Sequence, residues 1–326
     1  MAPDKEWSVT TTKSVAPNPG HMARARRDLR DNLKLVDVVL EVVDARAPLA
    51  SRNLSLSRAA GDKPRVMVLN KADLADPDAT ARWIAFFRRS GAESVPLEAQ
   101  SGRGLEQLEA TAARVAKKAV ARVMLVGIPN VGKSSLLNRL AGRARARVGA
   151  LPGMTRGKQW VRTAAGHLLL DLPGIFPLSF AGPDEEWALA VTGALPDFAY
   201  DHEVAASRLA ELLASGRRAQ LLSARYGLAA EDMDRPLEGI AKKRGYMGAG
   251  GRLDVARAAD ALLKDFREGV LGRVTLEQPG AVSAKPAPSL PEASVSSTGR
   301  KPETPSEPSQ PEPEEGEKQG EGAAGL

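Results

Sequence analysis

One segment, Gly127-Ile-Pro-Asn-Val-Gly132-Lys133-Ser134, constrains the fold of this chain more than any other. Its glycines, lysine and serine have the spacing of a phosphate-binding loop. The apolar residues 120–126 before it predict a buried strand, and the spacing over 134–140 predicts a helix after it. Glycines let backbone N–H groups surround phosphates, and a helix N-terminus favours negative charge. The segment therefore predicts a strand–loop–helix unit that binds phosphate, rather than an ordinary glycine turn.

The residue types of this loop indicate their roles. Lys133 is expected to reach the β- and γ-phosphates of a nucleotide, and the Ser134 hydroxyl is expected to bind Mg²⁺. Neighbouring residues supply backbone groups and the start of the helix: Asn130, Val131, Gly132 and Ser135. The loop therefore predicts a nucleotide with Mg²⁺ as its ligand.

A second motif, Asp171-Leu-Pro-Gly174, follows another apolar run downstream of the loop. In phosphate-loop enzymes an Asp at this place holds Mg²⁺, directly or through water, and the Gly amide meets the γ-phosphate. Thr155 lies between the two motifs, where a switch threonine could complete the Mg²⁺ shell; a plain loop threonine is the alternative. We therefore expect Lys133, Thr155 and Gly174 to act on the γ-phosphate.

A third motif, Asn70-Lys71-Ala-Asp73, follows the predicted strand at residues 65–69 and resembles the guanine-specificity motif of GTPases. There the Asp accepts two hydrogen bonds from guanine that adenine cannot supply, and a site built for such bonds rejects the wrong base. Glu98-Ala99 resembles the next motif, whose Ala amide meets guanine O6. GTPases usually have Ser or Asn where Glu98 stands, so this second match is weaker. Together the two motifs predict GTP/GDP as the ligand.

The order of these motifs is circularly permuted. GTPases ordinarily present the phosphate motifs first, whereas here the guanine motifs at 70–105 precede the phosphate motifs at 127–174. A sheet domain tolerates such a rearrangement because chain ends lie at its surface. The segment after Gly174 then leads directly into the C-terminal part of the chain, so we hypothesise that loss of the γ-phosphate moves that part.

The alternation of strand and helix patterns predicts the fold. Strands are expected at 35–43, 65–69, 94–97 and 120–126, a hairpin at 159–163 and 167–170, and helices at 79–89, 105–118 and 134–140. Such alternation favours a mostly parallel sheet covered on both faces. After Pro183 the strand signals fade and helical spacing remains. We therefore predict an α/β P-loop GTPase sheet with circularly permuted motif order, followed by a small all-helical C-terminal domain.

Composition divides the chain into four parts. Residues 1–19 are expected to form a mobile arm, 20–180 the GTPase domain with a leading basic helix at 22–34, 183–277 a helical domain, and 278–326 a disordered acidic, Pro-rich tail. The tail carries a net charge of −4, so the total of +6 leaves about +10 on residues 1–277. That excess suggests a polyanionic partner, although a basic protein without one is the alternative.

Two absences narrow the class further. The sequence has no cysteine and three widely spaced histidines, which excludes thiolate metal sites and disfavours zinc. No apolar stretch reaches the roughly 18 residues of a membrane span, and the N-terminus lacks the pattern of a signal peptide. We therefore expect a cytoplasmic protein without a membrane partner.

Over residues 18–276 the chain resembles the ribosome biogenesis GTPase A (YlqF-type) family of circularly permuted GTPases. The resemblance rests on the motifs above and on Pro19-Gly-His-Met22-Ala-Arg-Ala-Arg-Arg27, Val43-Asp-Ala-Arg46, Gln159-Trp160, Ala190-Val-Thr-Gly-Ala194, Arg225-Tyr-Gly-Leu228, Lys243-Arg-Gly245 and Gly250-Gly251. It implies a helical domain that contacts ribosomal RNA, a 50S ribosomal subunit precursor as partner, and a protein that is a monomer off the ribosome. One departure is Pro17-Asn18, where the family commonly has Trp-Phe.

The residue after Gly174 is Ile175, which cannot orient water as the Gln of many GTPases does. The resemblance makes His21 the candidate replacement, because His suits proton transfer near neutral pH. A second route is K⁺, because Asn130 resembles the asparagine that supports K⁺ binding in related GTPases. The alternatives are a docking role for His21 and a purely structural role for Asn130.

Basic clusters at Arg24–Arg30, Arg143–Arg147 and Lys242–Arg244 suit RNA phosphate contacts, with a solvated face as the alternative for any one of them. We therefore expect a GTP-hydrolysing switch that assists late maturation of the large subunit. Three alternatives stay open: a small-subunit assembly GTPase, an RNA-binding scaffold with a nucleotide-locked GTPase domain, and a P-loop ATPase. The lack of cysteine disfavours the first, the intact phosphate motifs the second, and Asn70–Asp73 the third.

Overall fold

A computed structural model describes residues 27–53, 60–142, 147–148, 160–170 and 182–280, and for 147–148 it describes the backbone alone. A seven-stranded sheet has the order β3-β2-β1-β4-β7-β6-β5. Its strands are β1 (Val38–Asp44), β2 (Arg65–Asn70), β3 (Glu93–Leu97), β4 (Arg122–Val126), β5 (Arg147–Val148), β6 (Trp160–Arg162) and β7 (Leu168–Leu170). Pairing is parallel from β3 to β7 and antiparallel at β6 and β5. The predicted, mostly parallel sheet is confirmed.

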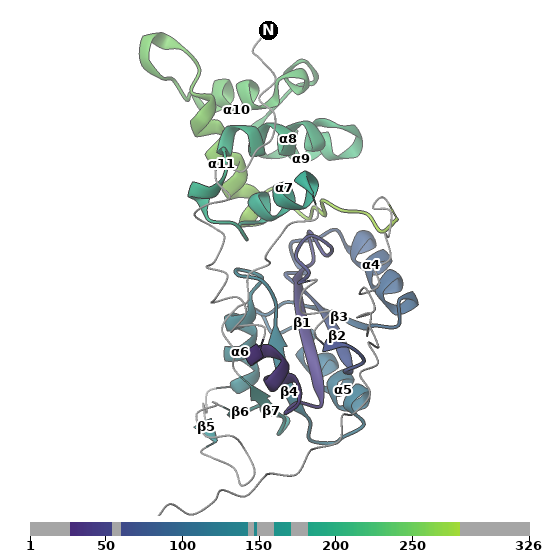
Figure 1. The fold of residues 1–326 in the computed structure, drawn as a ribbon. Coiled ribbons are helices and arrows are strands. Elements are labelled where there is room, and N and C mark those ends of the chain that lie inside the picture. The colour runs from purple at the N-terminus through teal and green to yellow at the C-terminus, as the bar shows by residue number, and fades with distance from the viewer. Residues whose placement is uncertain (1–26, 54–59, 143–146, 149–159, 171–181, 281–326) are drawn as a thin grey trace, which may run out of the picture. The chain divides into compact units, whose positions relative to one another are not determined.

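Helices cover both faces of the sheet, as Figure 1 shows for α4, α5 and α6 around the central strands. Alternate residues of β1 enter different clusters, because successive strand side chains point to opposite faces. Leu40 packs in the core that α5 (Leu105–Ala116) and α6 (Lys133–Ala141) cover. Val39 packs with the helical residues 27–33, and Val43 packs with α4 (Pro77–Arg89).

Two strands run one residue further than the sequence pattern predicted. β1 begins at Val38 rather than at Leu35 and ends at Asp44, and β2 ends at Asn70. The reason is the parallel ladder, in which Asp44 lies opposite Asn70, so both polar residues are still held by strand pairing. Parallel strands gather their carboxyl ends at one edge of a sheet, where ligands bind in open α/β folds. The first residues of the guanine motif therefore start from a rigid position.

The C-terminal region is helical, which the sequence predicted. It contains α7 (Pro183–Thr192), α8 (His202–Ala214), α9 (Ala219–Tyr226), α10 (Pro236–Arg244) and α11 (Val255–Arg267). Short 3₁₀ turns lie at Asp197–Ala199, Gly216–Arg218, Ala230–Asp234 and Ala249–Gly251. Helix α11 packs on α8, with Leu262 and Leu209 fully buried in the shared core. We call residues 183–267 the helical region.

Local signals explain where these helices begin and end. Asp201 precedes α8 and accepts hydrogen bonds from the N–H groups of Glu203 and Val204, which no helical carbonyl can reach. Helix α7 starts at Pro183 and ends at Gly193, which adopts a left-handed conformation with φ +77°. At this ending the backbone amides of Gly193 and Ala194 donate to the carbonyls of Ala190 and Leu189, while the carbonyls of Val191 and Thr192 accept from side chains elsewhere in the chain.

Within the described residues, no helix combines the length and apolar character needed to span a lipid bilayer.

Candidate nucleotide-binding site

The phosphate-binding loop joins β4 to α6 at the carboxyl edge of the sheet, as the sequence predicted. Two of its glycines are required by close approach. A Cβ on Gly127 would lie 2.5 Å from the Val42 carbonyl oxygen, and a Cβ on Gly132 would overlap Asn70 Nδ2. Gly132 also has φ +96°, which side chains rarely tolerate. Asn130 has φ +60°, and Asn is one of the few other residues that adopt this conformation.

The loop also presents positive charge. Lys133 Nζ donates to the Ile128 carbonyl at 2.5 Å, and burial lowers the pKa of Lys133. Ser134 and Ser135 are exposed in the first turn of α6. The described part of that turn contains no acidic residue and no side-chain cap, so its N–H groups and the positive end of the helix dipole face outward. A narrow glycine cradle beside a partly buried lysine fits nucleotide phosphates.

Asn70 connects the three segments of the site. Its Nδ2 donates to the Val131 carbonyl of the phosphate loop at 2.7 Å, and its Oδ1 accepts from the Ala99 amide at 3.0 Å. The residue is only 2% exposed, so the buried groups depend on each other as partners. The amide of Ala99, predicted to meet guanine O6, is thus engaged by Asn70 in this structure. A base oxygen at that amide would share it with Asn70 or displace it.

Lys71 begins the guanine-motif turn with φ +59°. The turn closes through the bond from the Leu74 amide to the Lys71 carbonyl, at 3.0 Å, and it leaves Asp73 exposed. Lys71 Nζ lies 2.9 Å from Oδ2 of Asp44. Asp73 is thus an exposed acceptor two residues after an anchored lysine.

Glu98 explains how the second guanine motif keeps its shape without the usual Ser or Asn. Its carboxylate accepts from Ser101 Oγ at 2.8 Å and from Arg103 Nη1 at 3.2 Å. Its backbone also pairs with Arg103 and Gly102. The side chain therefore closes the loop that presents Ala99.

A cavity of about 480 Å³ lies beside this loop and is lined by Ala99, Gln100, Ser135, Asn138, Arg139 and Gly142. Residues of the second guanine motif and residues of α6, the helix that follows the phosphate loop, both line this cavity. The sequence analysis missed Asn138 and Arg139, and Arg139 Nε donates to the Ala99 carbonyl at 3.4 Å. Their spacing from Ser135 was the available signal, because residues three and four apart share one face of a helix.

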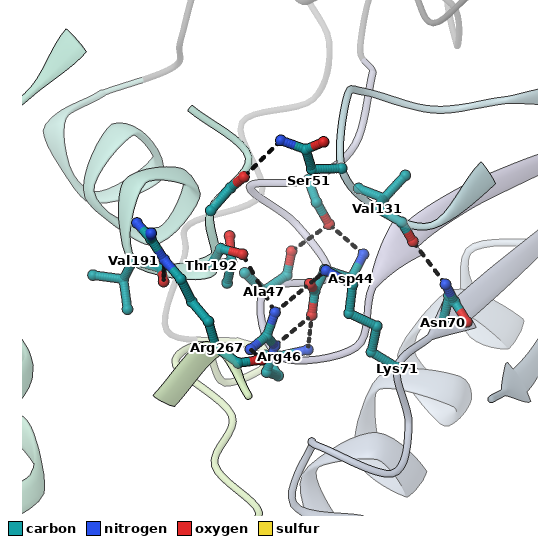
Figure 2. A network of polar contacts seen from close by, with 12 residues as sticks. Asp44, Arg46, Ala47, Ser51, Asn70, Lys71, Val131, Val191, Thr192 and Arg267 are labelled. Atoms are coloured by element: carbon teal, nitrogen blue, oxygen red, sulfur yellow. Dashed lines mark hydrogen bonds and ion pairs between the residues drawn. The ribbon is translucent and has the colours of Figure 1, made fainter. Parts of the chain in front are cut away.

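The sequence analysis also missed the roles of Asp44 and Arg46, which it treated as family marks alone. Figure 2 shows their carboxylate and guanidinium facing each other beside Lys71. Burial would raise the pKa of Asp44, but the charges and hydrogen bonds of Arg46 and the charge of Lys71 lower it well below its usual range. Asp44 is therefore a permanent buried anion between two cations.

Four predicted residues, His21, Thr155, Asp171 and Gly174, lie outside the described residues, as do Arg24, Arg26 and most of the Arg143–Arg147 cluster. Among the residues that the structure describes, no group of three or more acidic or histidine side chains could hold a metal ion. The structure thus brings together the loop residues, Asn70, Lys71 and Ala99.

A sheet with a glycine cradle after β4 and a guanine motif after β2, earlier in the chain, defines a class: a P-loop GTPase with permuted motif order. Comparisons with known proteins agree. The family model described as "50S ribosome-binding GTPase" matches residues 122–207. Ribosome biogenesis GTPase A of Bacillus cereus is 40% identical over 278 residues, which cover 80% of this chain and 93% of that protein. The counterpart in Thermotoga maritima is 32% identical over 263 residues, with 80% and 93% covered.

Solved structures give the same result. GNP-bound YlqF from T. maritima matches with a TM-score of 0.57 and 29% identity, over 79% of this chain and 100% of that one. A GDP-bound YlqF structure matches with a TM-score of 0.58. The chain belongs to the ribosome biogenesis GTPase A family and is a GTPase that binds GTP and GDP.

Proposed function

We propose that this GTPase binds a precursor of the 50S ribosomal subunit and acts as a GTP/GDP switch in its late maturation. The nucleotide-binding part of this proposal rests on one observation. The buried side chain of Asn70 bonds both the phosphate loop, at Val131, and the loop of Ala99. We call this pair of bonds the Asn70 clamp. The ribosomal part rests on family membership, because the relatives are named ribosome biogenesis GTPases.

The roles proposed for the described residues follow from where they lie. Lys133 and the backbone of Asn130–Ser135 hold the phosphates, with the α6 N-terminus supplying N–H donors. Asp73 accepts from the guanine N1–H and 2-amino group, and Lys71 flanks the base. The Ala99 amide donates to O6, sharing its hydrogen with Asn70. A site of this kind disfavours adenine because adenine offers Asp73 no pair of donors in that arrangement.

Mg²⁺ is proposed as the metal, held by Ser134 together with Thr155 and Asp171. Mg²⁺ neutralises charge on the phosphate oxygens when it is bound. Gly174 is proposed to meet the γ-phosphate through its amide. Because Ile175 cannot orient water, His21 is proposed to position it.

K⁺ is proposed as a further ion at Asn130. The Nδ2 of this side chain donates to the Gly193 carbonyl at 2.9 Å, so the amide orientation is fixed by its partner. The side-chain oxygen is the atom that a hard cation would use. Positive charge there would replace an arginine finger.

Ribosomal RNA is proposed as the partner of residues 183–277, taken as the RNA-binding domain that follows a GTPase domain at 20–180. Lys242, Lys243 and Arg244 are exposed in the last turn of α10. Such cations suit phosphate contacts whose strength falls as salt rises. We further propose a cytoplasmic protein that is monomeric off the ribosome. The predicted N-terminal arm at 1–19 lies outside the described residues, as do residues 281–326 of the predicted tail, whereas Gln278 accepts hydrogen bonds from Arg82.

GTP turnover with and without purified 50S particles, in K⁺ and then in Na⁺ buffer, tests the proposal. We expect slow turnover alone and strong stimulation by 50S particles, greatest in K⁺. Stimulation by 30S particles alone would replace it with the small-subunit function. Absence of turnover under every condition would favour the nucleotide-locked scaffold.

The His21→Ala variant tests the water-positioning role under saturating 50S particles and K⁺. A turnover equal to that of the unmodified protein would remove His21 from catalysis. Preference for ATP in a nucleotide competition assay would overturn the guanine assignment altogether.

A further inference from the structure

The C-terminal end of α7 is held by side chains from three other parts of the chain. The last four carbonyls of a helix have no partner within it. Here Arg267 of α11 donates to the carbonyls of Ala190, at 2.9 Å, and Val191, at 3.2 Å. Arg46 donates to the Thr192 carbonyl at 3.4 Å, and Asn130 of the phosphate loop donates to the Gly193 carbonyl at 2.9 Å. Two of the three donors therefore come from the nucleotide-binding region.

Arg46 makes the same kind of contact with α11. Its Nη1 lies 3.3 Å from the Phe266 carbonyl and 3.4 Å from the Arg267 carbonyl, and its guanidinium lies 5.1 Å from the centre of the Phe266 ring. The residue is only 1% exposed. The C-terminal end of a helix carries partial negative charge, which favours a cation. The ends of α7 and α11 thus act together as a counter-charge for a buried arginine.

This counter-charge is needed because Asp44, Arg46 and Lys71 form a cluster with more positive than negative charge. Asp44 accepts from Arg46 Nε at 2.9 Å and Nη2 at 2.8 Å, and it also lies 2.9 Å from Lys71 Nζ. One buried carboxylate therefore faces two cations. Without the helix ends, the N–H groups of Arg46 that do not reach Asp44 would be buried without acceptors, and such groups are costly in a dry interior.

The cluster also controls the guanine motif. Lys71 is anchored at its tip by Asp44, while its backbone closes the turn that presents Asp73. Movement of Arg46 would release one side of Asp44 and change where the carboxylate sits. Lys71 would then lose its fixed partner, and the turn would lose its anchor.

We propose that Arg46 is a positioning residue for guanine recognition and that the helix ends of α7 and α11 complete the nucleotide-binding site through it. The inference rests on the proposed role of Asp73 at the base. It makes the helical region part of the guanine site, and the contact between Asn130 and Gly193 joins the phosphate side to the same helix end. Occupancy of the site and the position of α7 are then energetically coupled, and the coupling is reciprocal.

Base discrimination tests the proposal. IDP lacks the 2-amino group, so Asp73 loses one of its two bonds, and we expect the unmodified protein to bind GDP about 10- to 100-fold more tightly than IDP. In Arg46→Gln we expect GDP binding to weaken about 10-fold and the ratio of the IDP to the GDP dissociation constant to fall at least about threefold. Titration of each nucleotide by calorimetry measures both quantities.

Arg65→Gln is the matched control. Arg65 also pairs with a buried carboxylate of β1, since its Nη1 lies 3.3 Å from Glu41 Oε2. The Arg65→Gln substitution should lower thermal stability and leave the ratio of the IDP to the GDP dissociation constant unchanged. An Arg46→Gln protein that loses stability in the same way, with an unaltered ratio, overturns the positioning role. If the unmodified protein does not distinguish GDP from IDP, the proposed role of Asp73 fails instead.

Hydrogen exchange supplies an independent readout. GDP should slow exchange of the amides at residues 189–193 in the unmodified protein and have little effect there in Arg46→Gln. Unchanged exchange on adding GDP to the unmodified protein overturns the coupling. Should Arg46→Gln not fold, Arg46→Lys serves both experiments, because a single ammonium cannot take the places of Nε, Nη1 and Nη2, which between them reach Asp44 and the carbonyls of both helix ends; the same directions are expected, and an unchanged ratio overturns the proposal.

Discussion

The two halves of the nucleotide-binding site are built in different ways. The phosphate half is one continuous segment, Gly127–Ser135, whose shape depends on glycines and on the start of α6. The guanine half is assembled from Asn70–Asp73 and Glu98–Gly104, held by hydrogen bonds between residues far apart in the sequence. Arg46, which contacts the ends of α11 and α7, provides further support for the guanine half.

This difference has a consequence for mutation. A local segment fails when its backbone can no longer adopt the required conformation. An assembled site fails when any distant partner moves, and it fails by degrees. The phosphate half should therefore respond sharply to small changes within it, whereas the guanine half should respond in graded steps to changes in several places.

Gly132→Ala should have the largest effect. The new Cβ would overlap Asn70 Nδ2, and φ +96° is unfavourable for alanine. Backbone strain of this kind costs about 1–3 kcal/mol before the steric overlap is counted, so we expect GDP affinity to fall at least about 100-fold. Gly166→Ala, with φ +87° in the β6–β7 turn and only an ordinary contact with Val120 Cγ2 at 3.9 Å, is the control and should bind GDP normally. Equal losses of GDP affinity in both variants would contradict the view that the phosphate half depends on its own local backbone conformation.

Asn70→Ala should come next, because it leaves the Val131 carbonyl and the Ala99 amide without their partner. A buried group left unpaired costs about 1–3 kcal/mol, which predicts GDP binding roughly 10- to 100-fold weaker. Asn70→Asp separates the two bonds, since a carboxylate can still accept from Ala99 but cannot donate to Val131. Calorimetric titration of both variants with GDP measures how much each of the two bonds contributes. Unaltered GDP affinity in Asn70→Ala would show that the phosphate and guanine halves keep their arrangement without the Asn70 clamp.

Glu277 predicts a pH dependence for the segment behind the guanine half. Its carboxylate accepts from the amides of Leu49 at 2.7 Å and Ala50 at 2.9 Å, and the preceding residue, Leu276, donates its amide to the Arg46 carbonyl at 2.8 Å. Burial, helped by Glu185 and Asp44, raises the pKa of Glu277 to about 7, against the opposing effect of the two amides. Because the folded protein holds the proton more tightly than the unfolded chain, this contribution to stability is complete below about pH 4.5 and is lost as the pH rises through about 7.

The Glu277→Gln variant removes that titration. The stability of the unmodified protein relative to the variant should fall by about 1–3 kcal/mol between pH 5 and pH 8, since one pKa unit corresponds to about 1.4 kcal/mol. Urea unfolding at pH 5, 6.5 and 8 measures it. Parallel curves for the two proteins across this range would mean that Glu277 titrates normally in the folded state.

The smallest effect is expected at Glu98. Its ion pair with Arg103 is exposed on the arginine side, and pairs of this kind contribute about 0–1 kcal/mol. Glu98→Gln keeps an acceptor for Ser101, so GDP affinity should change by no more than about threefold. A loss as large as that of Asn70→Ala, measured by the same titration, would mean that the shape of the Ala99 loop depends on charge.

The sequence by itself determined the phosphate half, the motif order and the parallel sheet with a helical C-terminal region. These features are local or periodic: glycines at fixed spacing, apolar runs for buried strands, and residues three and four apart for helices. The apolar side chains of β1 alternate between the two faces of the sheet, entering one core on one face and two on the other, as that periodicity requires.

The tertiary structure alone decided which distant groups meet. Nothing in the sequence pattern places Arg46 beside carbonyls more than 140 positions later, or Asn130 against Gly193. Backbone carbonyls leave no trace in residue identity, so an acceptor at a helix end cannot be found from a motif. Strand ends, helix ends and buried charges become partners only when the chain folds, because desolvation then makes every unpaired group costly.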